Sequence, residues 1–176
     1  MVQVKDKSFQ IFLNEQEIAH KVKELALLIE ADYTNTTPLL LPLLNGSFIF
    51  ASDLMRALTI PCSLDFVKYK SYHGMKSSGS VSKSLPPSGE LKGKDVLIIE
   101  DIVDTGLTMK AMLEDLQQQG VRSVNICTLL FKPGKFKESY QVKYKGFEIP
   151  DDFVVGYGLD YDGQGRNLPA IYKVLE

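Results

Sequence analysis

Short apolar runs, separated by amphipathic stretches, are the feature that most constrains the fold of this chain. They lie at 38–44, 94–100 and 123–131, and the first, PLLLPLL, is too short and too apolar for a surface helix. We predict that they are buried parallel strands, which are covered on both faces in α/β proteins. Helices are predicted at 48–59 and 107–119, between the strands. This alternation indicates an α/β fold, with a mostly parallel, twisted sheet flanked by helices.

Local signals predict where the helices begin and end. Asn14, with Glu17 three positions later, predicts a capping box at the start of a first helix over 14–31. Ser47 is expected to cap the second helix, and Gly120 to end the third. Shorter β segments are expected at 62–70, around 153–157 and around 171–174.

Composition limits the classes of protein to which the chain can belong. With 176 residues, 44% of them hydrophobic and 24% charged, we expect one globular domain over 1–176. A net charge of −2 argues against a general nucleic-acid binder. We expect no membrane partner, because no apolar run approaches the ~20 residues of a spanning helix, and no secretory signal is visible. Cys62 and Cys127 are expected to be buried, reduced thiols of a cytoplasmic protein, and the sequence shows no zinc pattern.

The segment 71–93 differs from the rest of the chain. It is rich in Ser and Gly, contains a Pro-Pro pair and has little apolar content. Long loops within compact domains are either functional or disordered. We interpret this one as a mobile lid, because it leaves the ligand-binding edge of the predicted sheet, with a plain surface loop as the alternative.

The stretch from Val96 to Thr108, VLIIEDIVDTGLT, carries the strongest chemical signal. A buried strand ends at Glu100 and Asp101, whose side chains are expected to diverge because adjacent strand residues face opposite ways. Carboxylates suit sugar hydroxyls and Mg²⁺. Asp104 and a Thr-Gly pair then open a helix, where unpaired N–H groups form an anion site. Together these features predict a site for a phosphorylated sugar.

A purely structural interpretation of the same stretch remains open at this point. Asp104 and Thr105 have the side chains of helix caps, and a cap would consume the amides that an anion needs. Glu100 and Asp101 would then mark a solvated strand end. A three-residue DTG motif does not decide between the two interpretations, whereas the full thirteen-residue string is far more specific.

That string resembles the phosphoribosyl-pyrophosphate motif of the type I phosphoribosyltransferases. Further blocks narrow the resemblance to the hypoxanthine (hypoxanthine-guanine) phosphoribosyltransferases, and it covers about residues 36–174. The blocks are LLNGSFIFASDL at 43–54, DFVKYKSYHG at 65–74, LLFKP at 129–133 and DDFVVGYGLDYDGQGRNLP at 151–169. The implied fold adds a small hood, built from the chain ends, and the mobile lid.

The resemblance implies a role for residues around phosphoribosyl pyrophosphate. Asp104 would be the general base at N7 of the purine. Glu100 and Asp101 would hold the ribose hydroxyls, partly through Mg²⁺, and Asp160 would be a further Mg²⁺ ligand. The other contacts implied are the 5′-phosphate loop of Asp104, Thr105, Gly106, Leu107 and Thr108, the pyrophosphate contacts of Asn45, Gly46 and Arg166, and the closing loop with Ser71 and Tyr72.

It also implies the base-binding residues and the reaction. Lys132 would donate to the 6-oxo group, Phe153 would stack on the purine, and Val154 would meet its edge, with Asp160 nearby. The reaction would transfer ribose 5-phosphate from phosphoribosyl pyrophosphate to hypoxanthine, with guanine as a second base. The implied cofactor is Mg²⁺, and the implied assembly is a homodimer or homotetramer.

Asn45 departs from the family pattern, in which a basic residue often stands at this position. The backbone contacts of the loop could survive, but the side-chain charge is lost, so we expect Arg166 and Mg²⁺ to carry more of the pyrophosphate binding. The family also has a non-proline cis peptide in this loop, and whether Asn45–Gly46 is that bond is not readable from the sequence.

Some residues have an ordinary alternative interpretation. On its own, Phe153 would be assigned to the core, and Lys132 to the surface. The basic run KPGKFK at 132–137 is expected to be solvated, and neither His20 nor His73 is assigned to chemistry.

Two other functions remain as alternatives: a non-catalytic, nucleic-acid-binding regulator with this fold, and a phosphatase with Asp101 or Asp104 as its nucleophile. The acidic pI and the absence of an added DNA-binding segment argue against the first, and the lack of a second acidic motif argues against the other.

Overall fold

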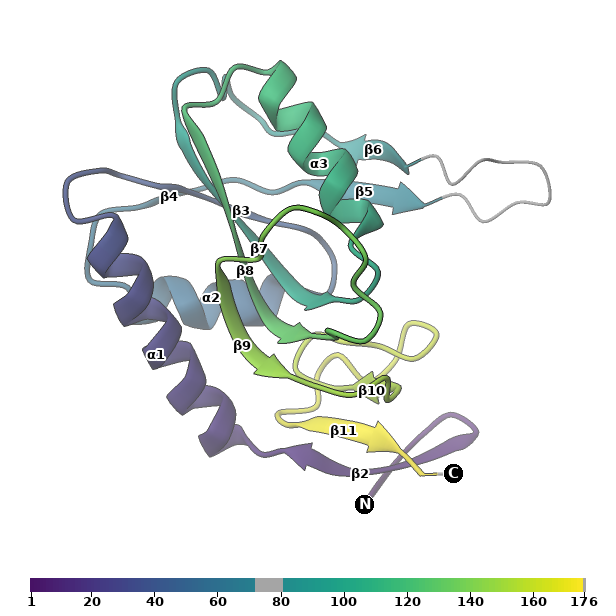
Figure 1. The fold of residues 1–176 in the computed structure, drawn as a ribbon. Helices are drawn as coiled ribbons and strands as arrows, with labels where there is room; N and C mark the ends of the chain where they lie inside the picture. The colour runs from purple at the N-terminus through teal and green to yellow at the C-terminus, as the bar shows by residue number, and fades with distance from the viewer. Residues whose placement is uncertain (72–80, 176) are drawn as a thin grey trace.

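The computed structural model describes residues 1–71 and 81–175. A five-stranded parallel sheet forms its centre, with the strand order β4-β3-β7-β8-β9 (Figure 1). This confirms the predicted parallel α/β fold, including its three long buried strands. The strands are β3 (Leu39–Pro42), β4 (Ser63–Leu64), β7 (Asp95–Val103), β8 (Ser123–Phe131) and β9 (Tyr144–Glu148).

Helices cover both faces of this sheet, as Figure 1 shows. α1 (Glu15–Asp32) and α2 (Phe48–Ala57) pack on one face, and α3 (Leu107–Gln118) packs on the other. The alternation of strand side chains is visible in β3, where Leu40 joins the core under α1 and α2, while Leu39 and Leu41 join the core under α3. Both faces are therefore buried, which explains the unbroken apolar runs. No helix within the described residues is long and apolar enough to cross a membrane.

The capping prediction is confirmed for α1 and wrong for α2. Oδ1 of Asn14 accepts hydrogen bonds from the N–H groups of Gln16 at 2.9 Å and Glu17 at 3.0 Å, and the Glu17 carboxylate accepts from the Asn14 N–H at 2.8 Å. Ser47 precedes α2 but does not cap it. Its buried hydroxyl donates instead to the Leu43 carbonyl at 2.7 Å, which ties the start of α2 to the end of β3.

The two chain ends form a second sheet, the hood, with the order β1-β2-β11-β10. This confirms the hood that the resemblance implied. The N-terminal hairpin of the hood was not predicted, because its charged KDK turn gives a weak strand pattern. Strand β9 of the central sheet was also not predicted, because the sequence of 144–148 mixes polar and apolar residues. The hood strands are β1 (Val2–Val4), β2 (Lys7–Leu13), β10 (Val154–Val155) and β11 (Ile171–Val174).

The segment 71–93 is more ordered at its C-terminal end than a plain loop. β5 (Lys68–Ser71) pairs antiparallel with β6 (Val81–Leu85). Leu91 is buried in the core under α3, with 2% of its surface exposed. The prediction of one long loop over 71–93 is therefore wrong for 81–85, which form a strand, and for Leu91, which is buried in spite of the polar composition around it. Its central part, 72–80, lies outside the described residues.

Candidate active site

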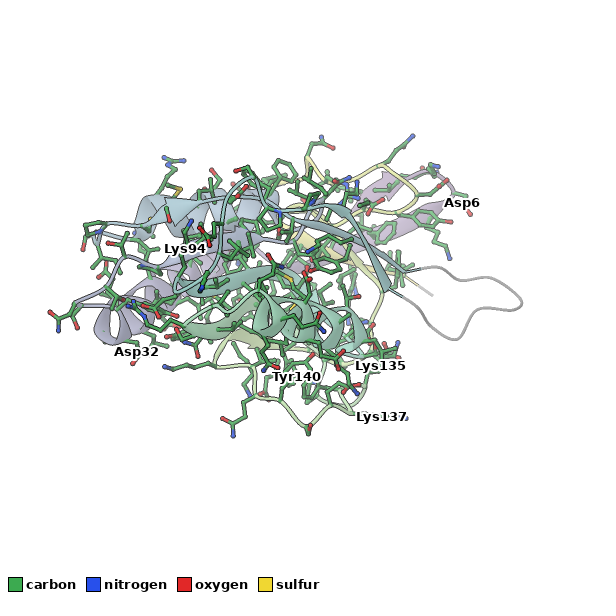
Figure 2. The ribbon with its side chains drawn as sticks, turned by 90° about the horizontal axis from the view of Figure 1, so that it is seen from above. Asp6, Asp32, Lys94, Lys135, Lys137 and Tyr140 are labelled. Carbon is green, nitrogen blue, oxygen red and sulfur yellow. The ribbon has the colours of Figure 1, made fainter. Side chains whose placement is uncertain are left out.

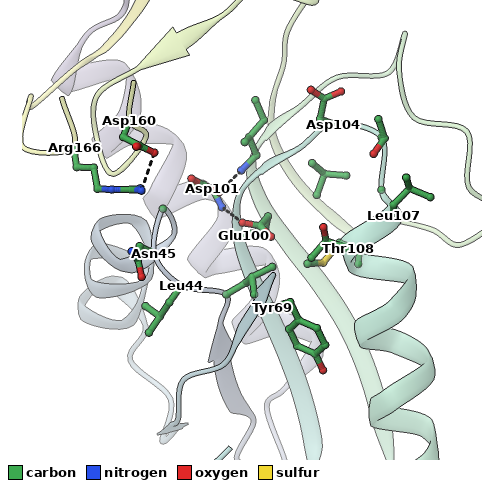
Figure 3. Close-up of a pocket in the computed structure, with 17 residues that line it drawn as sticks. Leu44, Asn45, Tyr69, Glu100, Asp101, Asp104, Leu107, Thr108, Asp160 and Arg166 are labelled. Carbon is green, nitrogen blue, oxygen red and sulfur yellow. Dashed lines mark hydrogen bonds and ion pairs between the residues drawn. The ribbon is translucent and has the colours of Figure 1, made fainter. Parts of the chain in front are cut away.

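One pocket, of about 320 Å³, lies where the carboxyl ends of β3 and β7 meet the N-terminus of α3 (Figure 3). Ligands bind at this edge in parallel α/β sheets. The pocket brings together most of the predicted site residues from four separate parts of the chain. Those that line it are Asn45, Gly46, Glu100, Asp101, Asp104, Thr105, Gly106, Leu107, Thr108, Asp160 and Arg166.

Glu100 and Asp101 form a buried acidic pair at the end of the sheet. Only 8% of Glu100 and 9% of Asp101 is exposed, which contradicts a solvated strand end. Burial raises the pKa of Glu100, and the negative charge of Asp101 raises it further. The two carboxylates are thus close enough to interact, although the alternation of strand side chains suggested that they diverge. Neither forms an ion pair with any cationic side chain that the structure describes, so the pair favours an added cation.

The N-terminus of α3 opens into the same pocket without a cap. Gly106 occupies the N-cap position with φ +87°, and no side chain caps the helix, so the interpretation of Asp104 and Thr105 as caps is wrong. A Cβ at Gly106 would come within 2.6 Å of the Tyr140 hydroxyl, which donates to the Gly106 carbonyl at 2.7 Å. The Tyr140 hydroxyl therefore packs against this turn, whose residues line the pocket, and uncapped amides at a helix N-terminus suit an anion.

The loop at Asn45 and Gly46 is tightly enclosed. A Cβ on Gly46 would collide with the Asp101 carboxylate, and a Cβ on Gly158 would collide with the Gly46 carbonyl. Only glycine therefore fits at both positions without a shift. The cis peptide bond of this loop is Leu44–Asn45, one residue before the bond that the sequence analysis considered.

Arg166 and Asp160 pair on the side of the pocket away from α3, as the dashed line in Figure 3 shows. The Arg166 guanidinium lies 2.7 Å from Oδ1 of Asp160 and also donates to the Gly158 carbonyl at 2.7 Å. The other Asp160 oxygen accepts from the Gly163 N–H at 2.7 Å. Both oxygens of Asp160 are therefore engaged, and a metal ion at this carboxylate would compete with Arg166.

Lys132 is buried beside Asp104 and is not the surface lysine of the alternative interpretation. It is 7% exposed, and its Nζ lies 3.1 Å from Oδ1 of Asp151 and 3.5 Å from Oδ2 of Asp104. Lys135 approaches the same two carboxylates, at 2.7 Å and 3.6 Å. The remaining oxygen of Asp104, Oδ1, is buried without a hydrogen-bond partner in the part of the chain that the structure describes. An acceptor in this state calls for a donor from a ligand.

The basic run at 132–137 is thus only partly solvated. Its first lysine is buried, Lys135 is paired, and Lys137 is exposed. Figure 2 shows Lys135 and Lys137 close together on the segment that follows β8.

The predicted base-binding residues Phe153 and Val154 do not line the pocket. Val154 lies in β10 and is buried, whereas Phe153 is 45% exposed, which contradicts its assignment to the core. The Phe153 ring leans on Tyr161, with ring centres 5.7 Å apart and planes at 82°, and on Phe9, at 6.3 Å. An exposed aromatic face supported from behind suits stacking on a flat base.

The sequence analysis missed three residues beside the site: Lys68, Tyr69 and Asp151. Tyr69 lines the pocket, Asp151 holds Lys132, and Lys68 contacts Asn45. Alternation within KYKS at 68–71 was the available signal for Tyr69. Of the two predicted closing-loop residues, Ser71 ends β5 and pairs with Val81, and Tyr72 lies outside the described residues.

Comparisons with known proteins agree with this geometry. Residues 9–162 match the family model described as a phosphoribosyl transferase domain. A hypoxanthine-guanine phosphoribosyltransferase from Aquifex aeolicus is 40% identical over 176 residues, which covers 99% of both chains. This chain belongs to the hypoxanthine-guanine phosphoribosyltransferases. The family assignment confirms the resemblance that the sequence blocks indicated.

Solved structures of this family have the same fold. A hypoxanthine phosphoribosyltransferase from Staphylococcus aureus superposes with a TM-score of 0.90 at 42% identity, covering 94% of this chain and 91% of the other. A hypoxanthine-guanine phosphoribosyltransferase from Bacillus anthracis has a TM-score of 0.89 at 35% identity, with coverage of 97% and 99%. The assignment to this family therefore rests on both sequence and fold.

Proposed function

We propose that the protein transfers ribose 5-phosphate from phosphoribosyl pyrophosphate to N9 of hypoxanthine and guanine, and releases pyrophosphate. The observation that carries this proposal is the uncapped start of α3, which shares one pocket with the acidic pair of Glu100 and Asp101. Amides suit a 5′-phosphate, and carboxylates suit ribose hydroxyls, so the two halves fit one sugar phosphate. The family membership supports the same reaction.

Mg²⁺ fits as the cofactor of this reaction. Among the described residues, no three acidic, His or Cys side chains converge to hold a metal by themselves. Mg²⁺ is typically bound by one or two carboxylates together with substrate phosphates. Glu100 and Asp101 provide such a pair, and a bound cation would offset the charge repulsion that raises the Glu100 pKa. When bound, Mg²⁺ neutralises charge on the departing pyrophosphate.

The chain's own residues account for the proton and the orientation of the base. As the bond from C1′ to pyrophosphate breaks and the bond from N9 to C1′ forms, the buried Oδ1 of Asp104 accepts the proton from N7. Lys132, within 3.5 Å of the other oxygen of Asp104, donates to O6. The exposed face of Phe153 stacks on the purine ring.

The assay that tests this function contains protein, Mg²⁺, phosphoribosyl pyrophosphate and one base at a time. Formation of nucleoside monophosphate and pyrophosphate in equal amounts, with hypoxanthine and guanine but not with adenine, is the expected result. A non-catalytic regulator would form neither product. A phosphatase would release inorganic phosphate without any base and pass through an aspartyl phosphate.

The location and assembly of the protein belong to the same proposal. We place the reaction in the cytoplasm, because its phosphorylated sugar carries several charges and does not cross a bilayer unaided. We expect a homodimer or homotetramer, which light scattering would distinguish from a monomer.

A further inference from the structure

Lys68 lies next to the one neutral polar side chain on the pyrophosphate loop. Its Nζ donates to Oδ1 of Asn45 at 3.0 Å. Asn45 lines the pocket, on the same side as Asp160 and Arg166 in Figure 3. An ammonium group therefore stands at the rim of the pocket, although position 45 itself carries no charge.

Backbone pairing fixes this contact, so it does not depend on one flexible side chain alone. Leu43 forms a parallel bridge with Val67, and the Leu44 N–H donates to the Val67 carbonyl at 2.8 Å. Val67 is only 1% exposed, which anchors this end of the pairing in the core. Because the two segments run in register, Lys68 starts β5 directly beside Asn45.

The charge of Lys68 remains available to a ligand. An amide oxygen orients an ammonium group without neutralising it, and the ammonium has three donors. Among residues 1–71 and 81–175, Lys68 has no carboxylate partner, whereas Lys132 and Lys135 each lie within 4 Å of two carboxylates. A cation held by a neutral group beside an anion-binding pocket is suited to bind an anion.

We propose that Lys68, oriented by Asn45, binds the pyrophosphate group of the substrate and of the product. The proposal rests on the proposed function, since it assigns a residue to the pyrophosphate half of the same pocket. It places the positive charge of this subsite on β5 rather than on the loop at 45–46. Arg166 then acts from the same side of the pocket, and both cations contact the pyrophosphate group.

A charge-relocation experiment tests the proposal. In the Lys68→Met variant, we expect the dissociation constant for pyrophosphate with Mg²⁺, measured by calorimetry, to rise about tenfold, the scale of a hydrogen bond between charged groups. The KM for phosphoribosyl pyrophosphate should rise in parallel, with a smaller change in kcat. Removal of one contact between opposite charges should also weaken the dependence of pyrophosphate binding on salt.

The double variant Asn45→Lys with Lys68→Met returns an ammonium group to the same place from the other segment. It should recover most of the lost pyrophosphate affinity and its salt dependence. If Lys68→Met weakens binding but the double variant recovers nothing, Lys68 only orients the loop and the proposal is wrong. Lys23→Met, which removes an exposed lysine of α1, is the matched control and should bind pyrophosphate as the parent does.

The outcomes separate this inference from the proposed function. If the parent converts hypoxanthine and Lys68→Met binds pyrophosphate like the parent, the function stands and the role of Lys68 is refuted. If the parent converts no base, the function is refuted, while the pyrophosphate titrations still decide whether Lys68 binds this anion.

Discussion

Replacement of Lys132 by Gln tests how the site distinguishes 6-oxo from 6-amino purines. The Lys132 ammonium has three donors and no acceptor. Asp151 takes one donor at 3.1 Å, and Asp104 lies at 3.5 Å, which leaves a donor for O6 of hypoxanthine. Adenine presents its own N–H donors at this position, so donor would face donor within a buried site. We therefore expect the parent to reject adenine by ~10⁴ or more in kcat/KM.

Gln carries both a donor and an acceptor, so it can serve either base. A hydrogen bond to a charged group contributes about 1.5–3 kcal/mol, so kcat/KM for hypoxanthine should fall about 10- to 150-fold in Lys132→Gln. Adenine loses an opposed donor, and its kcat/KM should stay level or rise. The hypoxanthine-to-adenine ratio should consequently shrink at least about tenfold, without vanishing.

Lys135→Gln is the control for this experiment. Lys135 contacts the same two carboxylates, at 2.7 Å and 3.6 Å, but it is far more exposed than Lys132, so its loss removes a comparable charge without removing the proposed base contact. We expect Lys135→Gln to leave the ratio unchanged, and urea denaturation to show that both variants are folded. If the ratio stays constant in Lys132→Gln, or falls equally in Lys135→Gln, then Lys132 does not recognise position 6.

Three further predictions concern other parts of the molecule. Asp104→Asn should lower turnover of hypoxanthine by roughly 10²–10⁴, the usual size of a general-base contribution, and near-normal turnover would exclude that role. Asp95 has its pKa lowered to about 2, first by its hydrogen bonds to Arg122. A carboxylate whose pKa is lowered in the folded state stabilises the fold at pH values above its unfolded pKa of about 4, and this stabilisation is lost as the pH falls toward 2. Asp95→Asn should therefore lower the free energy of unfolding by about 1–2 kcal/mol at pH 7 and by progressively less below pH 4, as measured by denaturant titrations. Asp115 on α3 accepts hydrogen bonds from the Tyr69 hydroxyl and from Lys83 of β6, both at 2.6 Å. Asp115→Ala should therefore accelerate hydrogen exchange in β5 and β6 while β7 stays protected. An equal change in all strands would show that Asp115 does not hold β5 and β6 against α3.

Most of the central fold was predictable because the local signals agree with the packing. The apolar runs at 38–44, 94–100 and 123–131 correspond to β3, β7 and β8, since strands buried on both faces carry few polar residues to obscure the pattern. The cap at Asn14 was predictable for a similar reason, because a capping box depends on residues three positions apart.

The elements that were missed depend on distant partners. Residues 81–85 read as a polar loop, yet they form β6 because β5 lies beside them and Asp115 of α3 holds Lys83. Ser47 has the residue type of a cap, but its hydroxyl donates to the Leu43 carbonyl and does not cap α2. Both outcomes depend on partners outside the local sequence, so local propensity does not predict them.

Most residues that line the pocket were predictable from the sequence, but their electrostatics were not. The string at 96–108 predicted the acidic pair and the loop at the start of α3. It did not reveal that Lys132 is buried between two carboxylates, because Asp151 is 19 residues away. Nor did it show that the charge missing at Asn45 is present on Lys68, since that contact requires the register between Leu43 and Val67.

Several polar groups of the pocket lack a bonding partner within the part of the protein that the structure describes. Among the described side chains, no cationic group pairs with the acidic pair, no side chain caps the first amides of α3, and no group donates to Oδ1 of Asp104. Ser or Asp at the N-cap would stabilise α3 by about 1 kcal/mol, but the side-chain oxygen would occupy the amides that we propose to bind the 5′-phosphate. Gly106 prevents this, since its φ of +87° and the Tyr140 hydroxyl behind it disfavour any Cβ. Gly106 therefore leaves the first amides of α3 uncapped at the expense of helix stability, and in the proposed function the substrate supplies the hydrogen-bond acceptors that these amides lack.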